Sequence, residues 1–229
     1  MQAPQRREHA RSSRRPRAPE DRQRLFLYAF AAAGVIGVVV AISVIFATGG
    51  STSGGPKGEV GVAVPNLAKL PGVQTGPPPW QPEEGGLRAR SQALGLPLLT
   101  QEALDSHYHA HLDVYDDGQP APVPGGIGIS RKEQVISVLH THGADGFIHV
   151  EAPQEYPYTL GQFFGVWGLN LSNKCIGGLC SKPLRVWVNG HPFEADPTRL
   201  ILANHQEIAI AYGTPPAKIP KGHDFTPVG

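Results

Sequence analysis

An uncharged apolar run near the N-terminus limits what the rest of the chain can fold into. Residues 25–47, LFLYAFAAAGVIGVVVAISVIFA, contain 23 residues and no charged side chain. As a helix this run would be about 34 Å long, which is enough to cross a hydrocarbon core of ~30 Å. We therefore expect one transmembrane helix over 25–47, with a separate segment on each side of the membrane.

A cleaved secretory signal peptide is the main alternative to this anchor. The apolar part of a signal peptide is usually only ~7–15 residues long. The run is longer than that, and no clear small-x-small cleavage site follows it. The sequence therefore favours an uncleaved single-pass anchor.

The segment before the run is strongly basic. Residues 1–24 hold eight arginines and, apart from Met1, no aliphatic side chain larger than Ala. We expect a disordered tail, because such a segment cannot bury enough apolar surface to offset its ordering entropy. Basic residues that flank a membrane helix stay on the cytoplasmic side. The tail is therefore expected in the cytoplasm near anionic lipid, and the C-terminal part outside the cytoplasm.

Composition divides the rest of the chain into three parts. Residues 48–86 are rich in Gly, Ser and Pro, which predicts a linker. Residues 87–215 are expected to form an extracytoplasmic domain, and the Pro- and Lys-containing residues 216–229 a C-terminal tail that frays. Without the basic tail the chain is mildly acidic, so nucleic-acid binding by the domain is not expected.

The domain is predicted to be mainly β. Residues 107–115 alternate between polar and apolar side chains, and 135–142 predict another strand. Asn189-Gly190 is a strong signal for a type I′ hairpin. Helical spacing of Leu160, Phe163, Phe164 and Trp167 predicts one short amphipathic helix within 158–171. We expect a small antiparallel sandwich or barrel-like domain.

The two cysteines, Cys175 and Cys180, are expected to pair. They stand in Cys-Ile-Gly-Gly-Leu-Cys, where the two glycines permit a tight loop. Outside the cytoplasm a structural disulfide is favoured over a redox or metal-binding role. Pairing would leave only nitrogen and oxygen ligands for a metal.

Histidines are concentrated in one part of the domain. Six of the ten lie between residues 107 and 149, and they are His107, His109, His111, His140, His142 and His149. In an extended strand, alternate residues share one face. If 143–146 form a four-residue hairpin loop, His140 faces His149, with Cβ atoms roughly 4.5–5.5 Å apart. A third histidine from 107–111, laid alongside, would complete a three-histidine set.

Three nitrogen ligands with an open position suit Zn²⁺ or Cu²⁺, whereas a carboxylate in place of one suits Fe²⁺ or Mn²⁺. Further ligands, or partners that orient the imidazoles, are expected among Asp113, Asp145, Glu151 and His205. A polar histidine face that responds to pH, or a chance surface cluster, are the alternatives to a metal site.

Several motifs within about residues 105–213 together resemble one protein family. They are His-x-His-x-His-Leu-Asp-Val, Ile-Gly-Ile, Leu-His-Thr-His-x-x-x-Gly-x-Ile-His-Val-Glu, Leu-Gly-Gln-Phe-Phe-x-x-Trp-Gly and Leu-Arg-Val-x-Val-Asn-Gly. The set resembles an uncharacterised family of bacterial and archaeal single-pass membrane proteins with a histidine-rich extracytoplasmic domain. That family has no established activity, so the resemblance assigns no catalytic residue. The His-x-His pair also resembles a cupin motif, but the spaced Glu of cupins is missing.

Three functions are compatible with these patterns. The first is a membrane-anchored domain that binds a divalent transition metal for binding, sensing or delivery. The second is a metal-dependent enzyme of the cell envelope, with Glu151 or Asp145 as acid or base. The third is a module without metal that docks an envelope protein partner through Phe163, Phe164 and Trp167.

Overall fold

The computed structural model describes residues 58–228. The expected basic tail, the membrane helix at 25–47 and the start of the expected linker lie outside this range. Within residues 58–228, no helix has both the length and the apolar character that a membrane span requires.

The domain is built on a seven-stranded mixed sheet with strand order β6-β7-β2-β10-β8-β9 and with β3 paired to β2. Its strands are β2 Ser106–Asp116, β3 Gln119–Ala121, β6 Leu139–His140, β7 Phe147–Ala152, β8 Leu184–Val188, β9 His191–Pro192 and β10 Gln206–Tyr212. β10 runs parallel to β2, and the other pairs are antiparallel. The domain is mainly β as expected, but the sheet is mixed and does not close into a barrel. The long connection between β3 and β10 is what allows the parallel pair.

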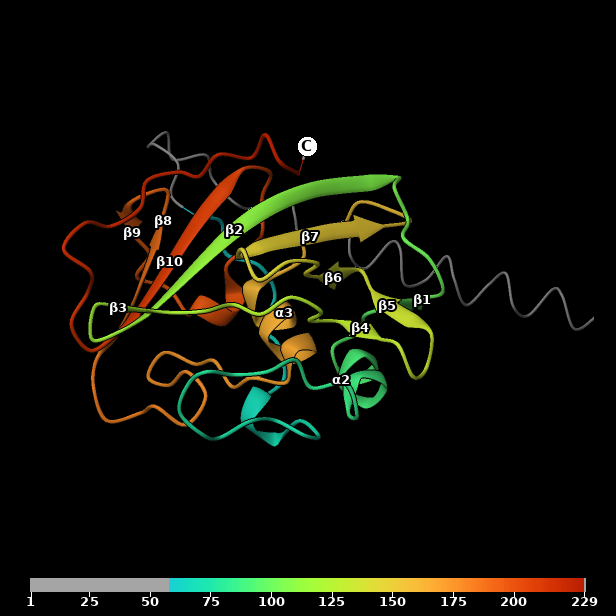
Figure 1. The fold of residues 1–229 in the computed structure, drawn as a ribbon, viewed down its shortest axis with the longest axis horizontal. Helices are drawn as coiled ribbons and strands as arrows, with labels where there is room; N and C mark the ends of the chain where they lie inside the picture. The colour runs from blue at the N-terminus through green and yellow to red at the C-terminus, as the bar shows by residue number, and fades with distance from the viewer. Residues whose placement is uncertain (1–57, 229) are drawn as a thin grey trace, which may run out of the picture. The chain divides into compact units, whose positions relative to one another are not determined.

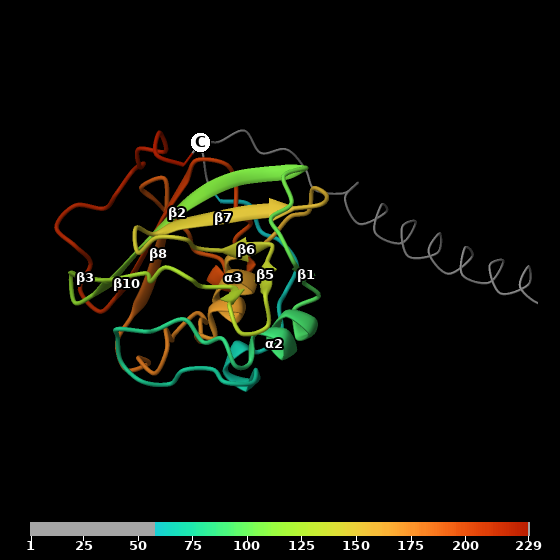
Figure 2. The ribbon, with the colours of Figure 1, turned by 45° about the vertical axis from the view of Figure 1, so that its right-hand side comes forward.

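A smaller sheet and two helices complete the fold. The small sheet has the order β1-β5-β4, with β1 at Leu98–Leu99, β5 at Val135–Ser137 and β4 at Ile129–Ser130. The helices are α2, Leu87–Ala93, and α3, Leu160–Trp167, and two 3-10 turns, η2 at Leu67–Lys69 and η3 at Pro197–Arg199, flank them. Figures 1 and 2 show α3 packed under the large sheet, with α2 beyond it. The strand expected over 135–142 is split, because β5 and β6 join different sheets.

Helix α3 forms where its spacing predicts, and it is buried on every side. Thr159 begins it with a capping box to Gln162, and Gly168 ends it in the left-handed region with φ 74°. All eight residues are buried, because the large sheet covers one side and upstream residues cover the other. Phe163, Phe164 and Trp167 are each 0% exposed, so they offer no docking surface.

Residues 58–86 belong to the packed domain rather than to a free linker. Leu67 and Trp80 are each 2% exposed and join the hydrophobic core. The indole of Trp80 meets that of Trp167 edge-on, with ring centroids 6.3 Å apart. The packed part of the chain therefore begins well upstream of residue 87.

Two local predictions are confirmed. Asn189 and Gly190 have φ values of 51° and 80°, as a type I′ turn requires, and Val188 pairs with His191 across it. Cys175 and Cys180 form a disulfide with Cα atoms 4.4 Å apart. Both features depend on short stretches of chain.

A buried arginine joins α2, α3 and the segment before them. The guanidinium of Arg90, 0% exposed, donates hydrogen bonds to the carbonyl oxygens of Gly165 (2.8 Å) and Val166 (3.1 Å) at the end of α3. It also donates to the carbonyl of Pro71 and pairs with the carboxylate of Glu83. These bonds supply donors to the last turn of α3, where Gly165 also accepts a hydrogen bond from the backbone N–H of Gly168.

We expect Arg90→Ala to lower the free energy of unfolding by about 3 kcal/mol, because it leaves several buried acceptors and Glu83 without their partner. Arg88→Ala on the same helix is the control. Arg88 is 61% exposed and pairs with Glu133 at the surface, so its loss should cost under about 1 kcal/mol. Urea unfolding of the two variants compares them, and equal costs would contradict the role assigned to Arg90.

Candidate metal centre

The large sheet has one apolar face and one histidine-bearing face. On β2, Ala110, Leu112 and Val114 enter the core, and the intervening side chains point to the opposite face. On β7 the core side chains are Ile148, Val150 and Ala152, which leaves the odd-numbered side chains on the histidine face. The expected alternation of 107–115 is confirmed.

Strand register brings histidines from three strands into one row. His140 of β6 is directly opposite His149 of β7, as the hairpin prediction required. His149 in turn is opposite His109 of β2. Antiparallel pairing therefore sets three imidazoles side by side on one face.

Among residues 58–228, the side chains that could hold a metal fall into three groups, and in each group the ligand atoms lie within 4.8 Å of one another. The first group is His107, His109, His149 and Glu151; the second is His140, His142, His149 and Glu151; the third is His111, Glu207 and His223. The first and second groups share His149 and Glu151 of β7. Five of the six expected histidine ligands thus adjoin one another, and His111 lies apart.

The first group has the spacing of a coordination site. Nε2 of His109 lies 3.2 Å from Nε2 of His107 and 3.1 Å from Nδ1 of His149. Oε1 of Glu151 lies 3.5 Å from His107 Nε2 and 3.4 Å from His149 Nδ1. Neighbouring ligands of a tetrahedral ion with bonds of ~2.0–2.1 Å are ~3.3 Å apart. Four of the six separations among these three nitrogens and one oxygen are therefore close to those around a tetrahedral ion, and all six are within 4.8 Å.

In the second group the chain fixes which nitrogen is offered. Nδ1 of His140 donates a hydrogen bond to the carbonyl of Ser137 at 3.0 Å. The neutral ring therefore presents the lone pair of Nε2, which lies 3.2 Å from Nε2 of His142. Thr141, between the two histidines, bonds to the carbonyl of Pro124 at 2.8 Å and anchors the segment to the neighbouring loop.

Burial keeps the clustered imidazoles uncharged. Burial and, to a smaller extent, the neighbouring histidines lower the pKa of His109 and His149 to about 4 and that of His140 to about 3. Burial also raises the pKa of Glu151. Oε2 of Glu151 is buried and has no hydrogen-bond partner. A buried carboxylate oxygen without a partner costs ~1–3 kcal/mol, which a bound cation would offset.

The residues of the third group make contacts that join strands and loops of the domain. His111 contacts Glu207 of β10 through Nδ1 at 3.0 Å and the carbonyl of Asp145 through Nε2 at 2.9 Å. Burial alone would lower the pKa of His111, but the hydrogen bond and charge of Glu207 outweigh it and raise the pKa. Both ring nitrogens of His111 therefore already face oxygen atoms that the fold itself supplies. The imidazole of His223 stacks on His111 with ring centroids 3.5 Å apart.

Three of the residues expected to support the cluster lie beside it. Asp113 faces Glu207 and Tyr115 on the far side of His111. The carboxylate of Asp145 accepts from the backbone of Phe147 at 3.3 Å. The backbone N–H of His205 donates to the carbonyl of His109 at 2.8 Å, and its ring stacks on Phe225. Of the expected supporting residues, Glu151 alone joins the two adjoining groups.

Sequence reasoning missed His223, Glu207 and Glu102 as neighbours of the histidines. His223 lies in the segment expected to fray, and nothing in its sequence context marks it. Glu207 is a carboxylate within a largely apolar strand, which is a signal in the sequence, but only the structure shows that it pairs with His111. Glu102 Oε1 lies 3.4 Å from His142 Nε2 and comes from a loop after β1.

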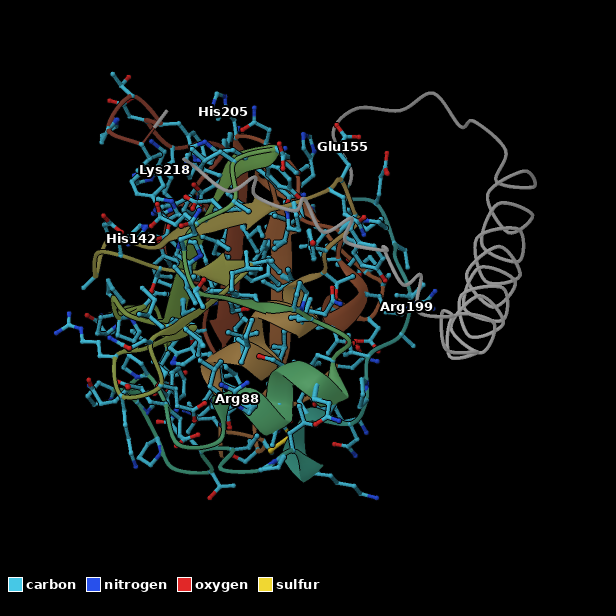
Figure 3. All side chains as sticks on the ribbon, turned by 90° about the vertical axis from the view of Figure 1, so that its right-hand side faces the viewer. Arg88, His142, Glu155, Arg199, His205 and Lys218 are labelled. Carbon is cyan, nitrogen blue, oxygen red and sulfur yellow. A yellow bond between two sulfur atoms is a disulfide. The ribbon has the colours of Figure 1, made fainter. Side chains whose placement is uncertain are left out.

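His142 is the ligand most open to solvent. Its side chain is 46% exposed, and Figure 3 shows it at the edge of the domain. It lines a hollow of about 550 Å³ together with Arg131 and Glu84. The second group can therefore be reached by a small molecule.

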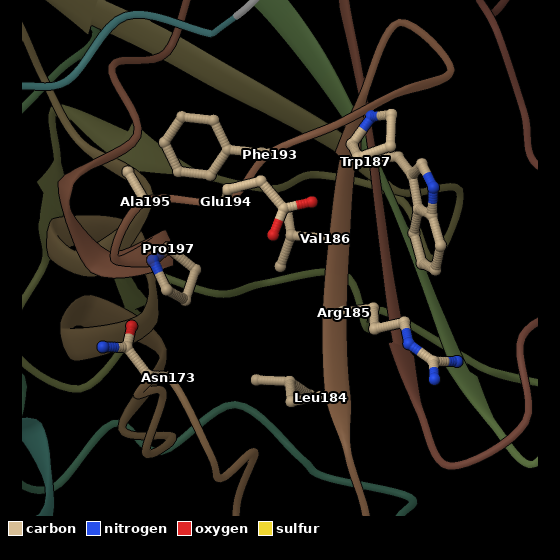
Figure 4. Close-up of a pocket in the computed structure, with 10 residues that line it drawn as sticks. Asn173, Leu184, Arg185, Val186, Trp187, Phe193, Glu194, Ala195 and Pro197 are labelled. Carbon is tan, nitrogen blue, oxygen red and sulfur yellow. The ribbon is translucent and has the colours of Figure 1, made fainter.

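A separate cavity of about 410 Å³ lies beside β8 and β9. In Figure 4, Leu184 and Val186 point toward it, whereas Arg185 and Trp187 leave the opposite face of β8. No histidine lines this cavity, so it is not part of the candidate metal centre.

Comparison of the chain with protein-family models, curated proteins and solved structures finds no match. The function is therefore argued from the site.

The low pKa of His140 makes the stability of the metal-free protein depend on pH. Below about pH 6.5 the unfolded chain binds a proton at this residue, but the folded chain does so only near pH 3. Its contribution to stability is therefore present above about pH 6.5 and is lost as the pH falls toward 3. We expect the wild type to lose stability relative to His140→Gln as the pH falls from 6.5 to 4. Urea unfolding at several pH values measures it, and a constant difference would contradict the shifted pKa.

Proposed function

We propose that this protein is a membrane-anchored, extracytoplasmic domain that binds a divalent transition metal through clustered histidines. The observation that carries the proposal is the first group, in which three imidazole nitrogens and one carboxylate oxygen stand 3.1–3.5 Å from their neighbours. The site would hold the ion through His107, His109, His149 and Glu151.

The ligand atoms favour Zn²⁺ or Cu²⁺. Imidazole nitrogens with one carboxylate suit both ions, and a carboxylate ligand also admits Fe²⁺ or Mn²⁺. Both cysteines are tied in the disulfide, so no thiolate is present to select Cu⁺. The neutral state of His109 and His149 supports binding at neutral pH, because no proton has to leave before the lone pair is available.

The biological role that we propose is metal binding, sensing or delivery at the cell membrane. The apolar run at 25–47 would hold the domain at the outer face of the membrane, with the basic residues 1–24 in the cytoplasm. A tethered, partly exposed site suits exchange of an ion with a protein partner in the cell envelope.

Metal analysis of the full chain, purified in detergent, tests the proposal. We expect bound Zn²⁺ or Cu²⁺ by elemental analysis and a rise in melting temperature when either ion is added to the stripped protein. His107→Ala should weaken binding at least tenfold, because it removes one of four ligands. The side chain that it removes is 39% exposed, so the domain should still fold.

His191→Ala is the matched control. His191 is an exposed histidine on β9, outside all three groups, so its loss should leave metal affinity unchanged. Absence of metal from the purified protein, together with an unchanged melting temperature on addition of both ions, would contradict the proposal.

A metal-dependent enzyme is the second candidate function. The hollow beside His142 favours it, because catalysis needs an open coordination position that substrate can reach. Turnover of chromogenic esters or phosphodiesters by the zinc-loaded protein, lost in His142→Ala and kept in His191→Ala, would support it. No turnover of either substrate class would count against it.

A further inference from the structure

We propose that the cluster holds two metal ions rather than one, bridged by the carboxylate of Glu151. This inference rests on the proposed function, since it assumes that the first group binds an ion. It adds a second ion at the second group, held by His140 and His142, with the carboxylate of Glu151 shared between the two positions and His149 serving the first ion through Nδ1.

The two oxygens of Glu151 face different histidines. Oε1 lies 3.5 Å from His107 Nε2 and 3.4 Å from His149 Nδ1. Oε2 lies 3.8 Å from His140 Nε2, and it is the buried oxygen without a hydrogen-bond partner. A single ion at the first group would use Oε1 and leave Oε2 unsatisfied. A second ion beside His140 would satisfy it.

The histidines are divided in the same way. His107 and His109 stand on β2, with their Nε2 atoms 3.2 Å apart, on one side of β7. His140 and His142 stand on the other side, also with their Nε2 atoms 3.2 Å apart. Strand β7 lies between the two pairs and carries Glu151, the residue that both positions share.

One ion cannot serve both pairs. Opposite ligands of an ion with bonds of ~2.1 Å are ~4.2 Å apart. The two pairs, His107 with His109 and His140 with His142, do not combine into one group whose ligand atoms all lie within 4.8 Å of one another. Two ions with a bridging carboxylate are typically ~3.5–4 Å apart, which accommodates both pairs.

Charge around the second position also supports an ion there. Glu102 Oε1 lies 3.4 Å from His142 Nε2, which brings a second carboxylate to this position. The second ion would lie on the side of the cluster that adjoins the hollow lined by His142. A coordination position left free by the protein would open toward that hollow.

Copper loading of the full chain tests the inference, with the ion count and the magnetic coupling measured separately. We expect two Cu²⁺ ions per chain by elemental analysis. Two Cu²⁺ ions bridged by a carboxylate interact, so the doubly loaded protein should show a half-field resonance in its electron paramagnetic resonance spectrum. The singly loaded protein should lack it.

Two variants at exposed ligands separate the positions. His107→Ala and His142→Ala change side chains that are 39% and 46% exposed, so both proteins should fold, as circular dichroism checks. Each should lower the count from two ions to one and abolish the half-field resonance. Glu151→Gln should abolish the resonance, and His191→Ala should keep two coupled ions.

The outcomes distinguish this inference from the proposed function. No bound ion in the wild type would overturn both. One ion per chain, weakened by both His107→Ala and His142→Ala, would keep the proposed function and overturn the two-ion centre. Two ions without coupling, unaffected by Glu151→Gln, would overturn the bridge.

Discussion

The pairing of β2 with β7 on one side and β10 on the other is the constraint on which the site depends. Strand β2 has eleven residues, and its two faces make different contacts. The apolar face completes the core above α3, and the histidine face meets His149 and Glu151 of β7. Because side chains in a strand alternate strictly, a shift of one residue would move every histidine into the core and every core residue out. The same register therefore maintains both the fold and the ligand positions.

Electrostatics makes the metal-free cluster an unfavourable arrangement. The three imidazoles of the central row are buried enough to remain neutral at neutral pH, and Glu151 is buried beside them with one oxygen unsatisfied. Neutral nitrogens have lone pairs to offer but no charge with which to stabilise a carboxylate. A divalent cation provides the missing charge and uses the lone pairs at once.

His111 shows how one histidine of the same strand acquires a different role. Its position opposite Glu207 comes from the parallel pairing of β2 with β10, and the charge of Glu207 raises its pKa. The ring donates to two acceptors and is covered by His223. Neighbours from distant parts of the chain, rather than residue type, thus distinguish His111 from the candidate ligands two and four residues away.

The sequence by itself determined the features that short windows encode. These are the alternation of 107–115, the type I′ turn at Asn189-Gly190, the facing of His140 and His149 across a short loop, and the Cys175–Cys180 disulfide. Only the tertiary structure decided that β10 runs parallel to β2, that Glu207 and His223 meet His111, and that residues 58–86 pack on the core. The buried helix α3 shows the difference: spacing located it, but burial of all eight residues depends on what covers it. Turn chemistry and side-chain period act over a few residues, whereas contacts between distant segments depend on the packing of the whole domain.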